Sequence, residues 1–294
     1  MTLSMDVELV TIGTDQLGEG PVWLAAERQL LRVDIEARAI VLRCIAAANE
    51  RRRRFDARVG FAVPASAGGW IAGVGRELRR LPSLEARAEV LAAVEIGMTE
   101  NRFNDAACDA RGRLWAGTMS TVRQSGAGAL YRFLPDGEVT AALPGATISN
   151  GLDWNLDATR LYYVDSTTQR IDAIDFDLDR GRLGARRAFV AIDPDDGLPD
   201  GLAVDAEGGV WIALFGGGAV RRYLPDGRLD AEIRVPVTNP TSLAFGGREL
   251  TELYVTSAKH RLSAAQLERE PLAGSLLRLH PGVAGRATHR FGET

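Results

Sequence analysis

The chain has few of the residues that build disulfide frameworks, thiolate metal centres or histidine-based active sites. Its 294 residues include two cysteines, Cys44 and Cys108, which lack CxxC spacing, so neither a disulfide framework nor a cysteine zinc site is indicated. The three histidines, His260, His280 and His289, all lie near the C-terminus, and no GxSxG nucleophile motif is present. This pattern argues against a Ser-His-Asp hydrolase.

The sequence also lacks a strong excess of charge and any long apolar run. The formal net charge of −4 gives no general attraction to nucleic acid or to an anionic membrane. No apolar stretch reaches the ~20 residues of a membrane-spanning helix, and residues 1–8 do not resemble a signal peptide. We therefore expect a cytoplasmic protein with no nucleic-acid or membrane partner. The isolated run Arg51-Arg52-Arg53-Arg54 is interpreted as a solvated turn between strands rather than a nuclear address or a phosphate-binding patch.

An internal repeat is the main organising feature of the chain. The strings DARGRLWAGT at 109–118 and GALYRFLPDG at 128–137 return as DAEGGVWIAL at 205–214 and GAVRRYLPDG at 218–227. In both copies a strand containing tryptophan leads to a second strand that ends in a Pro-Asp-Gly turn. The recurring tryptophans are expected to pack between strands rather than to stack on a ligand.

Weaker copies bring the number of repeat starts to six. The starts lie roughly 40 to 50 residues apart, which is the length of a four-stranded propeller blade; they are Glu19, Gly60, Asn104, Asn150, Asp200 and Pro240. We therefore predict an all-β protein, a six-bladed β-propeller of four-stranded blades, as one domain over residues 1–294. Ring closure should pair a strand near residues 7–12 with a C-terminal hairpin near 275–291. The one expected helix covers 263–270, with Ser263 as N-cap.

Three of the repeat starts place an oxygen-bearing side chain directly before a glycine. They are the Glu19-Gly20, Asn150-Gly151 and Asp200-Gly201 pairs, each at the head of an apolar run. In a radial fold these side chains can converge on the central channel, and the glycines would let the backbone approach a bound ion closely. Two carboxylates and one amide oxygen suit Ca²⁺, Mg²⁺ or Mn²⁺, with Zn²⁺ and Fe²⁺ as alternatives. For any one pair alone, an ordinary turn is the better interpretation.

A fourth string, NRFND at 101–105, opens the third repeat. Arg102 and Asn104 could donate hydrogen bonds to a substrate rich in hydroxyl or carbonyl groups. Taken alone, this string fits a structural turn equally well.

These motifs together resemble the SMP-30/gluconolactonase/LRE-like family. The resemblance rests on LGEGPVW at 17–23, NRFND at 101–105, AGTM at 116–119, ISNGLDW at 148–154 and PDG at 199–201, in this order over nearly the whole chain. The tail TSAKHRLS at 256–263 looks like the bacterial sugar-acid lactonase branch.

The resemblance implies a six-bladed propeller with one divalent cation in its channel, held by Glu19, Asn150 and Asp200. It also implies substrate contacts from Arg102 and Asn104. Just after the AGTM string, where animal relatives carry a substrate-contacting glutamate, this chain has Thr121, whose hydroxyl can still bind a sugar hydroxyl. This difference from the animal relatives leaves the identity of the substrate open.

The function that follows is metal-assisted hydrolysis of a sugar lactone to the free aldonic acid. The cation would polarise the lactone carbonyl, and Asp200 is the candidate catalytic base on water. Because a bound cation lowers the pKa of a carboxyl ligand, the alternative is that Asp200 mainly holds and orients, with the water activated at the cation. Two other functions stay open: phosphotriester hydrolysis at the same site, and non-catalytic binding of calcium or a sugar acid.

Overall fold

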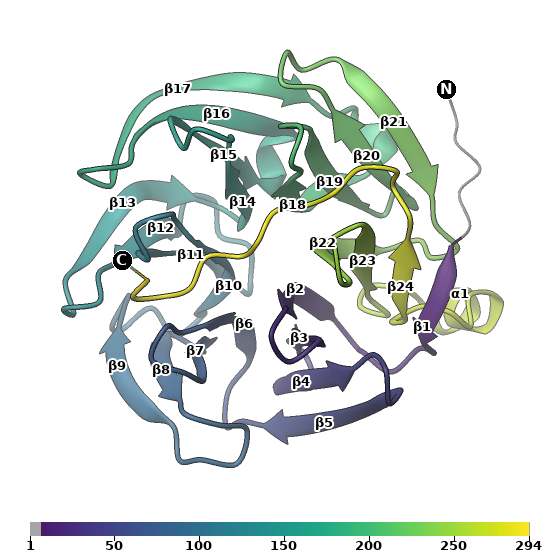
Figure 1. Ribbon diagram of the computed structural model, residues 1–294, viewed down its shortest axis with the longest axis horizontal. Coiled ribbons are helices and arrows are strands. Elements are labelled where there is room, and N and C mark those ends of the chain that lie inside the picture. Colours follow the sequence, from purple (N-terminus) through teal and green to yellow (C-terminus); the bar gives the residue numbers. More distant parts are fainter. Residues whose placement is uncertain (1–6, 294) are drawn as a thin grey trace.

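The computed structural model describes residues 7–293, and nearly all of their regular structure is β-strand. Six four-stranded antiparallel sheets surround a central axis (Figure 1). The first strands of neighbouring blades contact one another around this axis, which makes them the inner strands. The predicted six-bladed β-propeller is confirmed.

Five blades take their four strands consecutively from the chain. Blade one contains β2 (Gly18–Leu24), β3 (Gln29–Asp34), β4 (Ala39–Cys44) and β5 (Asn49–Arg54); blade two contains β6 (Val59–Pro64), β7 (Trp70–Val74), β8 (Glu77–Leu81) and β9 (Glu89–Ala93). Blade three contains β10 (Asn101–Cys108), β11 (Leu114–Ser120), β12 (Gly128–Phe133) and β13 (Val139–Ala146). Blade four contains β14 (Ser149–Trp154), β15 (Arg160–Asp165), β16 (Arg170–Asp177) and β17 (Arg182–Ala191); blade five contains β18 (Leu198–Val204), β19 (Val210–Phe215), β20 (Ala219–Tyr223) and β21 (Leu229–Arg234).

The sixth blade joins the two ends of the chain. It contains β22 (Pro240–Gly246), β23 (Glu252–Ser257) and β24 (Leu276–Leu279), with β1 (Glu8–Thr11) as its outer strand. The expected pairing of an N-terminal strand with a C-terminal one is thus confirmed. The expected second arm of a C-terminal hairpin is wrong, because both edges of β24 are already taken by β23 and β1.

All six predicted repeat starts fall inside inner strands. The residues are Glu19, Gly60, Asn104, Asn150, Asp200 and Pro240, in β2, β6, β10, β14, β18 and β22 respectively. The spacing of the repeat was therefore sufficient to predict the first strand of every blade.

The repeated tryptophans fill the spaces between blades, as expected. Trp115 and Trp211 are fully buried, and each indole N–H donates to the aspartate six residues before it, Asp109 at 2.9 Å and Asp205 at 2.8 Å. The two copies of the repeat thus share a buried polar contact as well as an apolar pattern, so neither indole N–H is left without a partner.

Two smaller predictions have opposite outcomes. The expected helix is present as α1 (Ala264–Arg269), and Ser263 caps it in a capping box with Gln266. The expectation of a turn at residues 51–54 is wrong, because these arginines belong to β5, the outer strand of blade one. An edge strand exposed to water accepts consecutive charged residues, which also disfavour pairing with another sheet.

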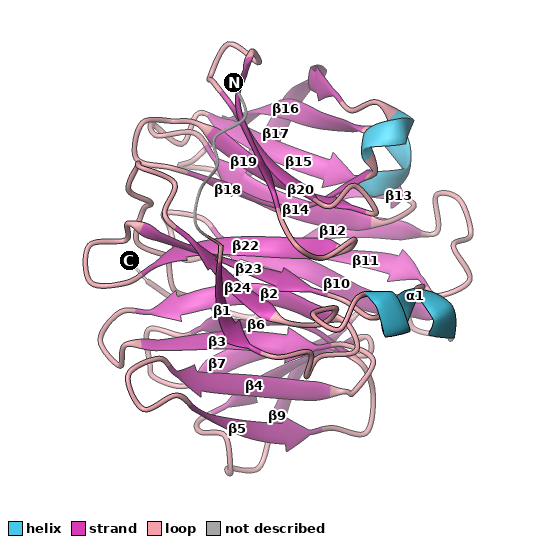
Figure 2. Ribbon diagram, turned by 90° about the vertical axis from the view of Figure 1, so that its right-hand side faces the viewer, coloured by secondary structure: helices cyan, strands magenta, loops and turns pink. Residues whose placement is uncertain are grey.

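The two faces of the propeller differ in what covers them (Figure 2). The inner strands begin on the face that carries α1 and the short 3-10 turns η1 (Ser166–Thr168) and η2 (Pro194–Asp196). They end on the opposite face, where residues 280–293 run across the ring (Figure 1). Within residues 7–293, no helix is long and apolar enough to cross a membrane.

Candidate functional site

A cavity of about 220 Å³ lies where the inner strands begin, and it receives side chains from five blades and from Arg58, which directly precedes the first strand of blade two. Every candidate residue from the sequence lines it: Glu19, Arg102, Asn104, Thr121, Asn150 and Asp200. This volume is below the ~300–1,000 Å³ of pockets for drug-sized ligands. The cavity therefore suits a small ligand such as a single sugar.

An irregularity in the inner strands brings these side chains to the axis. In β14 the pairing register shifts between Ser149 and Leu152, and in β18 it shifts between Pro199 and Leu202. Asn150 and Asp200 lie inside these bulges. A bulge adds an unpaired residue and changes the direction of its side chain, so both residues leave the alternation of the strand.

Glu19 reaches the cavity from a slightly different position. The register shift in β2 falls between Glu19 and Val22, so Glu19 is the last paired residue before the bulge. Relative to the bulge, Glu19 therefore lies one residue earlier in its strand than Asn150 and Asp200 do in theirs. Its side chain is one methylene longer than that of aspartate or asparagine and can span the extra distance.

The amide of Asn150 is fixed in one orientation. Its Nδ2 donates to the hydroxyl of Ser166 at 3.0 Å and to Oδ1 of Asp200. Its Oδ1 is buried and has no hydrogen-bond partner among the described residues. Because a buried polar atom without a partner is costly, this oxygen is suited to coordinate a cation.

The two carboxylates have the same kind of deficit. Glu19 and Asp200 are only 7% and 6% exposed. Burial and then the charge of Asp200 raise the pKa of Glu19 well above its usual range. Burial and then the charge of Asp105 raise the pKa of Asp200. Two buried carboxylates with no ion-pair partner in the described part of the chain are stabilised when a cation binds between them.

The donor set fits a hard divalent cation. Glu19 and Asp200 supply carboxylate oxygens, and the free Oδ1 of Asn150 supplies a neutral one. Residues 7–293 contain no cluster of three or more His, Cys, Asp or Glu side chains arranged to hold a metal, so an amide oxygen is needed to complete the set. All-oxygen ligation is typical of Ca²⁺, Mg²⁺ and Mn²⁺ sites.

Arg102 is a buried cation with no carboxylate in ion-pair contact among residues 7–293. Its Nη1 donates to Oδ1 of Asn104 and to the carbonyl of Phe103, each at 2.8 Å. Nδ2 of Asn104 in turn donates to the carbonyl of Ser149 at 3.0 Å. Burial lowers the pKa of Arg102 to about 10. Asn104 thus holds Arg102 in place, and the other guanidinium N–H groups can bind a ligand.

Thr121 lies at the exposed end of this wall. Its hydroxyl donates to Oε2 of Glu100 at 2.9 Å, and its backbone N–H donates to the carbonyl of Glu100 at 2.8 Å. A carboxylate therefore stands beside Thr121, although Glu100 is not among the residues that line the cavity.

The sequence analysis missed several residues of the cavity. Ser166, Arg123, His260 and Arg261 all line it. The position of His260 near the C-terminus, without a GxSxG motif, argued only against a Ser-His-Asp hydrolase, and closure of the ring brings its blade beside blade one. The TSAKHRLS string, which contains His260 and Arg261, was the available signal.

The glycines after the candidate ligands have a packing role that the sequence analysis did not predict. A Cβ atom on Gly151 would lie 2.5 Å from the backbone of β18, and one on Gly201 would lie 2.2 Å from the hydroxyl of Ser242 in β22. Gly20 instead has a left-handed φ of 49° with open space around its Cα. Gly151 and Gly201 therefore let neighbouring inner strands approach each other.

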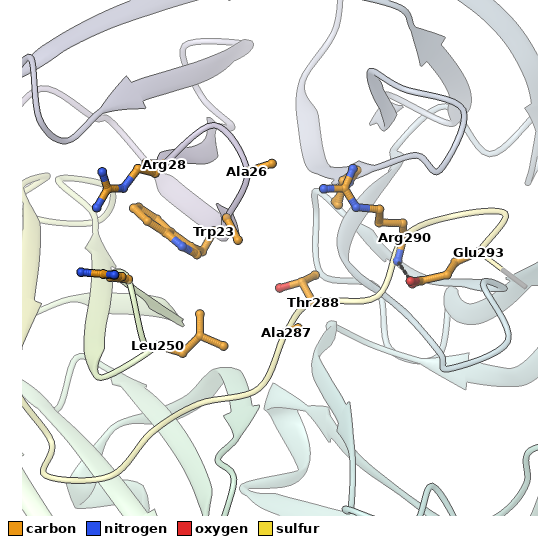
Figure 3. Close-up of a pocket in the computed structure, with 12 residues that line it drawn as sticks. Trp23, Ala26, Arg28, Leu250, Ala287, Thr288, Arg290 and Glu293 are labelled. Carbon is orange, nitrogen blue, oxygen red and sulfur yellow. Dashed lines mark hydrogen bonds between the residues drawn. The ribbon is translucent and has the colours of Figure 1, made fainter.

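A second cavity, of about 690 Å³, lies on the opposite face (Figure 3). Trp23, Arg28 and Leu250 line one side of it, and Thr288 and Arg290 of the C-terminal segment line the other. None of the six candidate residues reaches this cavity. The cavity of about 220 Å³, where the inner strands begin, is therefore the candidate functional site.

Comparison with known proteins shows which family the chain belongs to. The sequence model of the SMP-30/Gluconolactonase/LRE-like region matches residues 17–259. The chain belongs to this family. Regucalcin from Homo sapiens is 36% identical over 295 residues, which cover 98% of this chain and 99% of that protein.

Solved structures of the same type superpose over almost the full length. A calcium-binding protein, regucalcin, from Agrobacterium tumefaciens has a TM-score of 0.93 at 27% identity, covering 98% of this chain and 97% of that one. A luciferin-regenerating enzyme has a TM-score of 0.92 at 28% identity, covering 98% and 99%. The family resemblance seen in the sequence motifs is thus confirmed, and the SMP-30/gluconolactonase fold is shared along the whole propeller.

Proposed function

We propose that this protein hydrolyses the ring ester of a sugar-acid lactone to the free aldonic acid, with one divalent cation held by Glu19, Asn150 and Asp200. The observation that supports this most directly is the buried, partnerless Oδ1 of Asn150 beside two buried carboxylates. Membership of a family whose description includes gluconolactonase supports the reaction class. The small cavity supports a ligand of monosaccharide size.

The side chains divide the cavity into two parts. Glu19, Asn150 and Asp200 form an oxygen-rich wall for the cation, and Arg102 faces the same space as a donor. When bound, the cation supplies Lewis-acid polarisation of the lactone carbonyl. Arg102 donates to ring or hydroxyl oxygens of the substrate, and Asn104 keeps its guanidinium in position. Thr121 offers its hydroxyl oxygen to a sugar hydroxyl at the exposed end.

Asp200 is the candidate base for the attacking water. Its Oδ1 accepts from Nδ2 of Asn150, whereas its Oδ2 makes no hydrogen bond within the described residues. Oδ2 can therefore take a proton as the water oxygen bonds to the carbonyl carbon. The bond between that carbon and the ring oxygen then breaks, and the proton returns to the ring oxygen, which leaves as a hydroxyl.

The calcium-binding and phosphotriesterase alternatives share the same cation ligands. The Agrobacterium relative is a calcium-binding protein, and calcium binding fits the donor set without requiring catalysis. A phosphotriesterase would bind a neutral, more apolar substrate, which the charged groups of this cavity do not favour. The three functions therefore differ in turnover: a lactonase hydrolyses a lactone, a phosphotriesterase hydrolyses a triester, and a binding protein hydrolyses neither.

The test is turnover by protein stripped with chelator and reloaded separately with Ca²⁺, Mg²⁺, Mn²⁺, Zn²⁺ or Fe²⁺. Proton release from a panel of aldonolactones is followed beside hydrolysis of an organophosphate triester, with spontaneous hydrolysis subtracted. We expect cation-dependent hydrolysis of one or two lactones and none of the triester. Saturable binding of cation or aldonate with no turnover by folded protein would contradict the proposal and favour a binding protein.

A further inference from the structure

Two arginines at the mouth of the cavity have no assigned role. Arg123 lies in the connection between β11 and β12 of blade three, and Arg261 follows β23 of blade six. These blades face each other across the ring, yet both side chains line the same cavity. Burial, and then the charge of Arg261, lower the pKa of Arg123. The two guanidinium groups are therefore close enough to repel each other.

His260 lies beside the same positive charges. Burial lowers the pKa of His260, and the charges of Arg261, Arg102 and Arg123 lower it further, against the opposing charge of Glu36. His260 and the three arginines line the same cavity, so an anion bound there would be stabilised by all three positive charges.

None of these three arginines has a carboxylate partner in residues 7–293. Arg58, which lines the same cavity, differs because it pairs with Glu36 at 2.9 Å. Its charge is therefore compensated within the protein, and the charges of Arg102, Arg123 and Arg261 are not.

The charges of the cavity do not balance. Three carboxylates and four arginines line it. Two of the carboxylates are the candidate cation ligands, so with a divalent cation present the lining carries an excess of about three positive charges. A neutral sugar lactone has nothing to match this excess.

We propose that the natural substrate is an anionic sugar lactone, and that Arg123 and Arg261 bind a carboxylate or phosphate group at the end of the sugar away from the lactone carbonyl. A guanidinium fork matches the geometry of either group. Arg102, deeper in the cavity and beside the cation ligands, stays with the reacting end. Ring opening of this substrate gives a product with an anionic group at each end. The inference rests on the proposed lactonase function.

The first test compares three lactones with the same ring: a neutral aldonolactone, one with a terminal carboxylate and one with a terminal phosphate ester. We expect kcat/KM to be higher for at least one charged lactone than for the neutral one. In Arg123→Gln and Arg261→Gln the ratio of charged to neutral kcat/KM should fall about tenfold each, mainly through KM, because one charge-assisted hydrogen bond is lost. The better charged substrate identifies the anionic group.

Arg87→Gln is the matched control, since it removes the same charge from an exposed turn on the opposite face. It should leave the ratio unchanged, which separates a local contact from a general effect of net charge.

Binding provides a readout that does not need turnover. Calorimetry on calcium-loaded protein would compare the open-chain dicarboxylate, the monocarboxylate and the neutral alditol of one sugar. We expect the dicarboxylate to bind most tightly and to lose about tenfold in Arg123→Gln. Equal affinities, or equal losses for all three ligands, would overturn the inference.

The two proposals fail in different ways. If the neutral lactone is hydrolysed as fast as the charged ones and the arginine variants affect all alike, the anionic site is wrong and the lactonase function stands. If no lactone is hydrolysed, the lactonase function is wrong, and the calorimetry alone decides whether the mouth binds anions.

Discussion

Asn150 links the cation site to a residue that no sequence motif revealed. Its Nδ2 donates to Ser166, which follows β15 in the turn η1 and belongs to none of the family strings. This contact, together with the one from Nδ2 to Asp200, fixes the amide and leaves Oδ1 without a partner among the described residues. Residues that orient a metal ligand commonly contribute tenfold to a hundredfold to metal affinity.

We therefore expect Ser166→Ala to weaken Ca²⁺ binding by about tenfold, because the Asn150 amide can then rotate. Calorimetry on chelator-stripped protein would measure this. Thr168→Ala is the control, since the Thr168 hydroxyl donates to the carbonyl of Asp165 and does not touch Asn150. Unchanged affinity in Ser166→Ala would show that the amide needs no support.

Asp105 makes the stability of the metal-free protein depend on pH. Burial raises its pKa from 3.8 to about 6, although the N–H of Ala106 opposes the shift. The folded state therefore binds the proton more tightly than the unfolded state does. Stability contributed by the protonated group is full below the unfolded pKa and is lost as pH rises toward the folded pKa.

Asp105→Asn should consequently stabilise chelator-treated protein at pH 8 by on the order of 3 kcal/mol, since each pKa unit corresponds to ~1.4 kcal/mol. The difference should disappear below about pH 4, where Asp105 is protonated in both states. Urea unfolding at the two pH values measures this. A variant less stable than wild type at pH 8 would contradict it.

At the scale of elements, the inner strands show which features of the fold could be predicted from the sequence and which could not. The repeat starts predicted six inner strands because their apolar runs and spacing are local features. The register shifts near Glu19, Asn150 and Asp200 depend on pairing with the second strand of each blade and carry no local signal. For the same reason the tight approach at Gly201 was not predicted, since it depends on contact with β22.

The sequence also did not predict the cavity residues that follow the second strand of a blade. Ser166, Arg123 and His260 follow the second strand of a blade, where no repeated residue type marks them. The sequence therefore predicted the wall formed by the inner strands, and the structure was needed for the rest.

Asp205 forms a buried polar contact with Arg222 and Trp211 in blade five, and its loss should be costly. Asp205 is fully buried and accepts from Nε of Arg222 at 2.7 Å and from Trp211 at 2.8 Å. In Asp205→Ala, Arg222 keeps Asp230 and Glu207 as partners, but the buried N–H groups of Trp211 and Gly209 lose their acceptor. Since each buried donor left without a partner costs about 1–3 kcal/mol, the free energy of unfolding should fall by about 2–6 kcal/mol.

Glu207→Ala is the comparison, because Glu207 pairs with the same arginine from a side chain that is 65% exposed. It should change the free energy of unfolding by only about 0–1 kcal/mol. Urea unfolding followed by tryptophan fluorescence measures both variants. Equal effects would show that burial of Asp205 does not determine its contribution.

At the scale of the whole molecule, the ring is closed by four residues from the start of the chain. β1 supplies the outer strand of blade six, and the buried N–H of Leu276 in β24 donates to Oγ1 of Thr11 at 3.1 Å. The sequence predicted the pairing of an N-terminal strand with a C-terminal one. It did not predict that β1 takes the edge of β24 at which a further hairpin strand was expected.

Thr11→Val keeps the shape of the side chain and removes the acceptor, so the N–H of Leu276 loses its partner. We expect the free energy of unfolding to fall by about 1–3 kcal/mol. Thr11→Ser retains the hydroxyl and should keep most of the stability. Thermal and urea unfolding of both variants test the closure, and a Thr11→Val protein as stable as wild type would show that this contact does not secure it.

The central claim is that lactone hydrolysis requires one cation held by Glu19, Asn150 and Asp200. The most direct measurement titrates chelator-stripped protein with the preferred cation while binding and lactone hydrolysis are followed together, for wild type and for Glu19→Gln. We expect wild-type activity to rise with bound cation and to saturate at one equivalent. Folded Glu19→Gln should neither bind the cation nor hydrolyse the lactone at these concentrations. Full activity in stripped wild-type protein, or in Glu19→Gln, would contradict it.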